Sequence, residues 1–284
     1  MKFNNRVGVH LRLKDSLATM VHEAEELGLS TIQFFFVEQA TGKYVPLVPQ
    51  DKVAFLRARR TFLTHAFMHS SYWINPASYK KEVYELSQHL LSREFKIARE
   101  LEIPYIVLHP GAARGYEVTP TDPLGKLQGI QTMARMLNTV LRKERGIKIL
   151  LENAAHGNRC IGNDLNDFIA IRELLEFPDR VGFCFDTAHA FSYGYAMTPV
   201  NDLLRTLDKT MGLRNIKLIH LNDTQDAFGS KQDRHAFPGQ GSIGKEGLAP
   251  LLNHPLLTPI PKIIEGPESD KEGILKVLQD IASW

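Results

Sequence analysis

Nine side chains of the types that bind metal ions recur at related positions in this chain of 284 residues. Six of them stand at or just after the end of a different short apolar segment, and the other three lie in the segments that follow two of these. The six are His69, His109, Glu152, Asp186, His220 and Glu265, and the three are His189, Asp233 and His235. Each alone has an ordinary explanation as a hydrogen-bonding or capping residue. Their joint recurrence, with no cysteine among them, favours a hydrolytic site for zinc or manganese.

The charge of this set suits a phosphate group. Its four carboxylates carry four negative charges and three divalent ions would carry six positive ones, which leaves about +2 at the site. Nine ligands suffice for three ions if one carboxylate bridges two of them. The chain itself has a formal net charge of only +2, so no basic surface indicates nucleic acid, and anion binding must come from a local feature.

Eight apolar segments alternate with helical ones, which predicts a parallel sheet, and eight such units predict a (β/α)8 TIM barrel in a single domain over residues 1–284. The expected strands are Val7–His10, Thr31–Val37, Thr61–Phe67, Tyr105–Leu108, Lys148–Leu151, Val181–Phe185, Ile216–Ile219 and Lys262–Ile264. Helices are expected over about 15–27, 50–60, 79–101, 123–145, 164–176, 198–213 and 245–253 and after 269, with a long loop over 38–49. The ends of barrel strands share one face, where the nine side chains would meet. An open doubly wound sheet is the alternative, but no glycine fingerprint follows the first strand.

The composition indicates a globular protein in a reducing compartment. It is 43% hydrophobic and 23% charged. The first residues lack the apolar core of a signal peptide, and no apolar run approaches the roughly 20 residues that a membrane span needs. Cys160 and Cys184 show neither metal nor redox spacing, and Cys184 is expected in the core. We therefore expect a cytoplasmic protein that does not bind membranes.

Motifs spread over almost the whole chain resemble, in their order, those of the endonuclease IV family of apurinic/apyrimidinic (AP) endonucleases. The most specific are Asp-Thr-x-His at 186–189 and His-Leu-Asn-Asp at 220–223, which is followed by Asp-Arg-His at 233–235. The others are His-Ser-Ser-Tyr-Trp-Ile-Asn at 69–75, Leu-His-Pro-Gly at 108–111, Leu-Glu-Asn at 151–153, Phe-Gly-Ser at 228–230, Gly-Gln-Gly at 239–241 and Ile-Glu at 264–265.

This resemblance implies a DNA-repair enzyme with three zinc ions, some of them replaceable by Mn2+ or Fe2+. By analogy His69, His109 and Glu152 hold one ion; Glu152, Asp186, His220 and Glu265 the second; and His189, Asp233 and His235 the third. Glu152, the bridge, and Glu265 are the catalytic carboxylates. The implied reaction is hydrolysis of the phosphodiester 5′ to an abasic site in double-stranded DNA by a metal-bridged hydroxide. It leaves a 3′-hydroxyl and a 5′-deoxyribose phosphate, and the family also trims blocked 3′ ends.

The resemblance also suggests which residues contact DNA. Tyr72 and Trp73 follow His69 in the segment where the family has a loop that enters the duplex, and their rings would stack on exposed bases. The alternative is that both rings pack under the loop. In the family, the loop after the second strand carries an arginine. Residues 38–44 of this chain lack it, so Lys43 is the candidate substitute. We expect the enzyme to act as a monomer.

Two other functions remain open at this point. One is a metal-dependent sugar isomerase or epimerase of the related barrel superfamily, which uses one or two ions and fewer ligands. The other is a non-catalytic DNA-binding relative, which an intact ligand set argues against. The remaining histidines fill no ligand position and are expected in the core or on the surface: His10, His22, His65, His89, His156 and His254.

Overall fold

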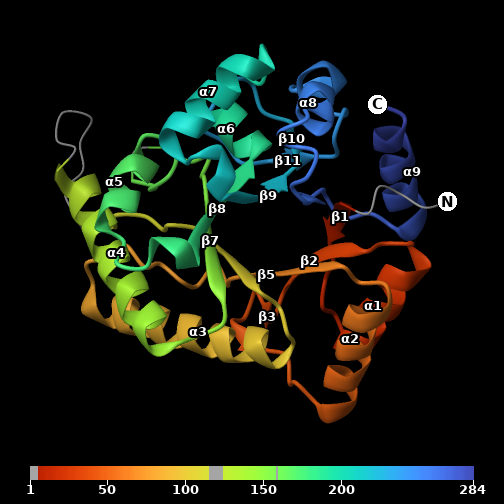
Figure 1. The fold of residues 1–284 in the computed structure, drawn as a ribbon, viewed down its shortest axis with the longest axis horizontal. Coiled ribbons are helices and arrows are strands. Elements are labelled where there is room, and N and C mark those ends of the chain that lie inside the picture. The colour runs from red at the N-terminus through yellow and green to blue at the C-terminus, as the bar shows by residue number, and fades with distance from the viewer. Residues whose placement is uncertain (1–5, 115–123, 158) are drawn as a thin grey trace.

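Eight parallel strands close into a barrel whose order is β1-β12-β9-β8-β7-β6-β5-β2 (Figure 1). The computed structural model describes residues 6–114, 124–157 and 159–284. The barrel strands are β1 (Val7–His10), β2 (Thr31–Phe35), β5 (His65–His69), β6 (Tyr105–Leu108), β7 (Lys148–Glu152), β8 (Val181–Asp186), β9 (Ile216–His220) and β12 (Lys262–Ile264). The predicted single-domain TIM barrel is therefore confirmed.

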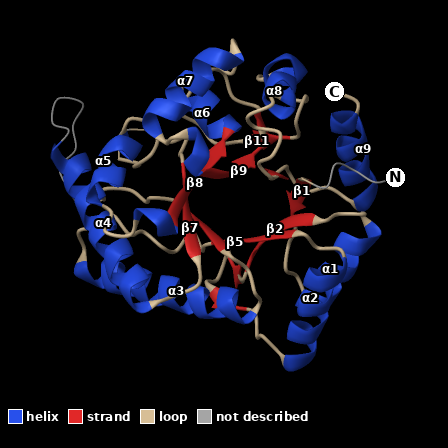
Figure 2. Ribbon diagram, in the orientation of Figure 1, coloured by secondary structure: helices blue, strands red, loops and turns tan. Residues whose placement is uncertain are grey.

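Helices surround the strands on the outside of the barrel (Figure 2). In the described residues they are α1 (Leu17–Glu26), α2 (Pro49–Thr61), α3 (Lys81–Glu100), α4 (Leu124–Lys143), α5 (Asp167–Leu174), α6 (Thr187–Tyr193), α7 (Val200–Thr210), α8 (Gly244–Asn253) and α9 (Lys271–Ala282), with short 3-10 turns at Pro178–Arg180 and Leu213–Asn215. Each longer helix turns one apolar face inward; α7, for example, buries Leu203, Leu204 and Leu207. Within the described part of the chain, no helix combines the length and apolar character needed to cross a membrane.

The interior of the barrel is a small apolar cluster, separate from the larger core between strands and helices. Its buried members are Phe67, Val107, Leu150, Cys184, Leu218 and Ile263, one from each of six strands. Cys184 is fully buried, as expected, and burial raises the pKa of its thiol to about 12. On β1 the corresponding inward residue is Gly8. Only glycine fits there, because an added Cβ would lie 1.8 Å from the Thr31 carbonyl oxygen.

The structure corrects several element boundaries. The third strand was expected over Thr61–Phe67 but is β5, because α2 continues through Thr61 and delays the strand to His65. The second strand ends at Phe35 rather than at residue 37. The proposed start of a helix at 123 lies outside the described residues.

The long loops contain structure that hydrophobic periodicity does not predict. The expected loop over 38–49 contains most of a hairpin of β3 (Val37–Glu38) and β4 (Lys43–Tyr44), which Gly42 permits with a φ of 69°. A second antiparallel pair, β10 (Asp223–Thr224) and β11 (His235–Ala236), follows β9. These segments are too short to carry a periodic signal.

Candidate metal centre

The alternation of side chains along a strand explains why the nine residues meet. Successive residues of a strand point to opposite sides, so the residue two places beyond an inward residue also points inward. On six strands, a residue of the inner cluster stands two places before a residue of the site. The pairs are Phe67 and His69, Val107 and His109, Leu150 and Glu152, Cys184 and Asp186, Leu218 and His220, and Ile263 and Glu265. The candidate centre is thus the next inward position above the apolar filling of the barrel.

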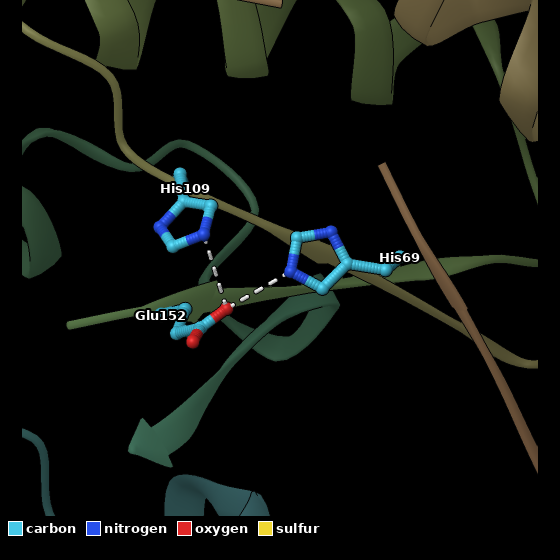
Figure 3. Close-up of side chains that lie close together, drawn as sticks. All are labelled: His69, His109 and Glu152. Carbon is cyan, nitrogen blue, oxygen red and sulfur yellow. Dashed lines mark hydrogen bonds and ion pairs between the residues drawn. The ribbon is translucent and has the colours of Figure 1, made fainter. Parts of the chain in front are cut away.

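The first group comprises His69, His109 and Glu152 (Figure 3). The Oε2 atom of Glu152 lies 3.2 Å from His69 Nε2 and 3.6 Å from His109 Nε2. Glu152 is fully buried, whereas the His109 side chain is 26% exposed. This group therefore opens toward solvent on the side of His109.

The second group shares Glu152 with the first and adds Asp186, His220 and Glu265. His220 Nδ1 lies 3.0 Å from Glu152 Oε1, 3.1 Å from Glu265 Oε2 and 3.7 Å from Asp186 Oδ2. The two oxygens of Glu152 consequently face different groups. This is the arrangement that a bridging carboxylate needs.

The outer group comprises His189, Asp233 and His235. The Oδ1 atom of Asp233 lies 3.3 Å from His189 Nε2 and 3.1 Å from His235 Nε2, and the two ring nitrogens are 3.4 Å apart. The side chains of Asp233 and His235 are 29% and 19% exposed. His189 comes from α6, whose N-cap is Asp186: the Asp186 carboxylate accepts a hydrogen bond from the His189 amide at 2.8 Å.

The spacing of the outer group fits a four-coordinate ion. Ligand bonds of about 2.0–2.1 Å in a tetrahedral zinc site place neighbouring ligand atoms about 3.3–3.4 Å apart. The outer group matches that spacing in all three of its separations, 3.1–3.4 Å. The donor set of imidazoles and carboxylates, without thiolates, suits zinc and manganese. The residues present therefore fit the ions that the resemblance implies.

Hydrogen bonds fix which nitrogen each imidazole turns toward the centre. The Nδ1 atoms of His69, His189 and His235 donate to the backbone carbonyls of Ser70, Asn153 and Glu265, at 2.8–2.9 Å. Each of these rings therefore keeps Nε2 for the site. His220 is oriented the other way, because its Nε2 donates to the Gln33 side-chain carbonyl at 2.9 Å. Partners of this kind fix the tautomer of metal-binding histidines.

In the metal-free protein, protonated histidines balance the negative charge of the buried carboxylates. Burial opposes ionisation of Glu152, but the charge of His220 and its hydrogen bond hold the pKa of this carboxyl well below the ordinary value. For His189, burial alone would lower the pKa. The charges of Asp186 and Asp233 outweigh this effect and raise the pKa well above the ordinary value. Ions that bind here must displace protons from such imidazoles.

His235 and His109 illustrate the two extremes. Burial disfavours the charged form of His235, but the hydrogen bond to Asp233 and the charge of Asp186 raise its pKa to about 9. Burial lowers the pKa of His109 to about 4, an effect that Glu152 offsets only in part. His109 is therefore already neutral and available to an ion near pH 7, whereas His235 must first lose a proton.

Two residues at the centre were not among the predicted site residues. His10, at the end of β1, was expected in the core or on the surface, but its Nδ1 lies 3.2 Å from Glu265 Oε1. Gln33 on β2 is fully buried and donates to Glu265 Oε1 at 2.6 Å while accepting from His220. Both stand two residues beyond an inward position, Gly8 and Thr31, so the two-residue rule that unites the other strands identifies them.

We predict that Gln33→Ala weakens metal binding by about 10–100-fold, because His220 and Glu265 both lose their orienting partner. The measurement is metal retained per chain during titration with a chelator. Gln128→Ala, an exposed glutamine on α4, is the matched control. Equal retention in both variants would show that Gln33 only fills space.

Of the predicted DNA-contacting residues, Tyr72 lies beside the first group. The Tyr72 side chain is 62% exposed, and its ring centroid lies 5.7 Å from that of His69 and 5.9 Å from that of His109. The Trp73 ring, 51% exposed, rests against the hairpin of β3 and β4: its Nε1 donates to the Gln39 carbonyl at 3.0 Å. Lys43 is exposed on β4.

A groove of about 1000 Å3 leads from the centre over the loops that follow β1 and β2. Its walls include the cations Arg12, Lys14 and Lys43 as well as Tyr72 and Glu265. The same walls carry the carboxylates of Asp15, Glu38 and Glu265, so the formal charges of the lining balance.

The fold and the arrangement of the site define a class, the xylose isomerase-like TIM barrels, and a family model of that description matches residues 21–282. Among curated relatives, probable endonuclease 4 of Thermosipho africanus is 33% identical over 286 residues, covering 96% of this chain and 99% of the relative. Probable endonuclease 4 of Thermotoga maritima is 33% identical over 291 residues, covering 98% of each chain. The chain belongs to the endonuclease IV family of AP endonucleases, the nucleases of DNA repair that its motifs resemble.

Solved structures agree with this assignment. The crystal structure of endonuclease IV from Thermus thermophilus matches with a TM-score of 0.80 and 28% identity over 98% of this chain and 99% of that one. A D-tagatose 3-epimerase-like protein matches with a TM-score of 0.70 but only 18% identity. The second likeness concerns the fold alone.

Proposed function

We propose that this enzyme hydrolyses the phosphodiester 5′ to an abasic site in double-stranded DNA and also trims blocked 3′ ends, using three zinc ions held by the nine predicted ligands. The observation that carries the proposal is the geometry of Glu152, whose two oxygens face two different ligand groups beside a third. All nine side chains come from one chain, so the proposed site is complete in a monomer. When bound, the ions activate water and offset the charge that grows on the phosphate.

The protein's own residues have separate parts in this mechanism. Glu152 keeps the first and second groups together. Glu265 turns Oε2 toward His220, while His10 and Gln33 hold its Oε1. The outer group, with its exposed Asp233, is the part that an entering phosphate reaches from solvent. Tyr72 lies beside the first group and lines the groove that leads to the centre.

The test is cleavage of a labelled duplex with a single abasic site by protein purified without added metal. The expected product ends in a 3′-hydroxyl that a DNA polymerase extends, and an intact duplex should remain uncut. Isomerisation of a free sugar with no cut in the abasic duplex would favour the isomerase alternative. The outer group argues against that alternative, because an isomerase with one or two ions has no ion for the three ligands of this group.

We predict that Trp73→Ala weakens binding to abasic duplex about ten-fold, within the roughly 1–3 kcal/mol that base stacking contributes. The ring is half-exposed in the loop that follows His69, and its loss also removes the hydrogen bond to the Gln39 carbonyl. Lys43→Ala should cost less and mainly flatten the salt dependence, as loss of one phosphate contact does. The measurement is a titration of abasic and intact duplexes at two salt concentrations.

Leu256→Ala is the control for Trp73→Ala, because this leucine is 61% exposed on the loop before β12, at the other end of the barrel. Metal content should stay unchanged in every variant of this series. If Trp73→Ala binds abasic duplex as tightly as the wild type, the ring only supports the hairpin and the stacking role is refuted.

A further inference from the structure

The two oxygens of Asp233 face different partners. Oδ1 points to the histidines of the outer group, whereas Oδ2 lies 3.8 Å from the Nε2 atom of His156. Among the described residues, the ion pairs of Asp233 involve only these three histidines. His156 comes from a different loop, the one after β7, and it belongs to none of the three ligand groups.

The backbone of His156 is held in place although its side chain is 59% exposed. The buried Asn163 side chain donates to the carbonyls of His156 and Gly157, at 2.7 and 2.8 Å. Lys126 in turn donates to the Asn163 side-chain carbonyl at 2.7 Å. The loop thus presents this imidazole from a fixed position, unlike a histidine on a free surface turn.

The place of His156 next to the centre supports a role there. It lines a cavity of about 250 Å3 together with Asp233, His109 and His189. The neighbouring Ala154 and Ala155 are buried and carry no polar side-chain atoms. His156 is therefore the polar side chain that this part of the loop turns toward the outer group.

We propose that His156 is a positioning residue of the outer metal site, which holds the free oxygen of Asp233 while the other oxygen faces the ion. The inference rests on the proposed function, because it assumes an ion in the outer group. Carboxylates that bind a metal through one oxygen are held by a hydrogen bond to the other. The exposed ring needs to approach by about 1 Å to form an N–H···O bond of about 2.9 Å. His189 and His235 are each held by a backbone carbonyl, and His156 gives Asp233 the equivalent support.

The test measures the ions held per chain during titration of the metal-loaded enzyme with a chelator. His156→Ala should raise the dissociation constant of the most weakly held ion about 10–100-fold and leave the other two unchanged. Excess zinc should restore cleavage in this variant. His22→Ala, an exposed histidine on α1, should behave as the wild type.

Two conservative variants separate hydrogen bonding from bulk. The side-chain amide nitrogen of glutamine reaches about as far as Nε2 of histidine, whereas that of asparagine reaches only as far as Nδ1. His156→Gln should therefore retain the third ion nearly as well as the wild type, and His156→Asn should resemble His156→Ala.

Two results would overturn the inference. One is release of the third ion from His156→Ala at the chelator concentration that releases it from the wild type. The other is simultaneous loss of all three ions, which would mean that His156 supports the loop rather than Asp233. A wild-type protein that never holds a third ion is a separate result. It refutes the proposed three-ion site, and with it the ion that Asp233 and His156 are proposed to support.

Discussion

Glu152→Gln is expected to reduce cleavage of abasic duplex at least about 1000-fold, a barrier increase of about 4 kcal/mol. Glu152 is the one side chain that the first and second groups share. An amide keeps one neutral oxygen and replaces the other with an NH2 donor, so one group loses its ligand from Glu152 and the other keeps only a weaker one. The measurements are the single-turnover rate and the metal content of the variant.

The fold should survive this substitution, because the apolar cluster beneath Glu152 is unchanged. Far-ultraviolet circular dichroism and the unfolding midpoint without metal therefore serve as checks. Glu85→Gln, an exposed glutamate on α3, is the matched control. A Glu152→Gln enzyme that keeps more than about a tenth of the wild-type rate would exclude Glu152 as the bridge.

Removal of metal by a chelator is expected to abolish cleavage, and about three zinc ions per chain should restore it. The imidazoles must be neutral to bind an ion, and those of His189, His220 and His235 have raised pKa values in the metal-free protein. At His235 protons therefore compete with an ion up to that group's pKa of about 9. Metal affinity should rise with pH over this range and fall steeply in acid.

The metal-free protein should show the opposite trend in stability. A histidine whose pKa is raised on folding contributes stability that is complete below its unfolded pKa of about 6.5 and is lost as pH rises toward the folded value. For His235 this interval ends near pH 9. Thermal unfolding of metal-free and zinc-loaded protein across pH 6–9.5 tests both signs at once. Stability of the metal-free form that stays constant across that range would contradict the ion-pair description of the outer group.

The barrel and the nine clustered residues were predictable because they depend on patterns that are local in the sequence. Apolar segments mark the strands, and the polar residue at each end marks the face. His109 and Glu265 illustrate this, since each follows its strand by one residue. The closure of the sheet then brings together residues as distant as His69 and Glu265.

Other features depend on contacts that no local pattern encodes. The hairpin around Gly42 packs against the Trp73 ring, which lies 3.3 Å from where a Cβ on Gly42 would stand. Gln33 was overlooked because amides are seldom ligands, although it aligns His220 and Glu265. The relation of His156 to Asp233 joins two loops that are 77 positions apart in the numbering, 233 minus 156.

The two-residue offset between apolar filling and ligands has an evolutionary consequence. A single insertion or deletion inside a strand would turn its ligand outward into the helical layer and bring a neighbouring residue of the sequence into its place. Changes of length in the loops beyond the ligands leave that register untouched. Within this architecture, a loop such as the hairpin of β3 and β4 can change in length, while the spacing within the strands must stay fixed for the ligands to face inward.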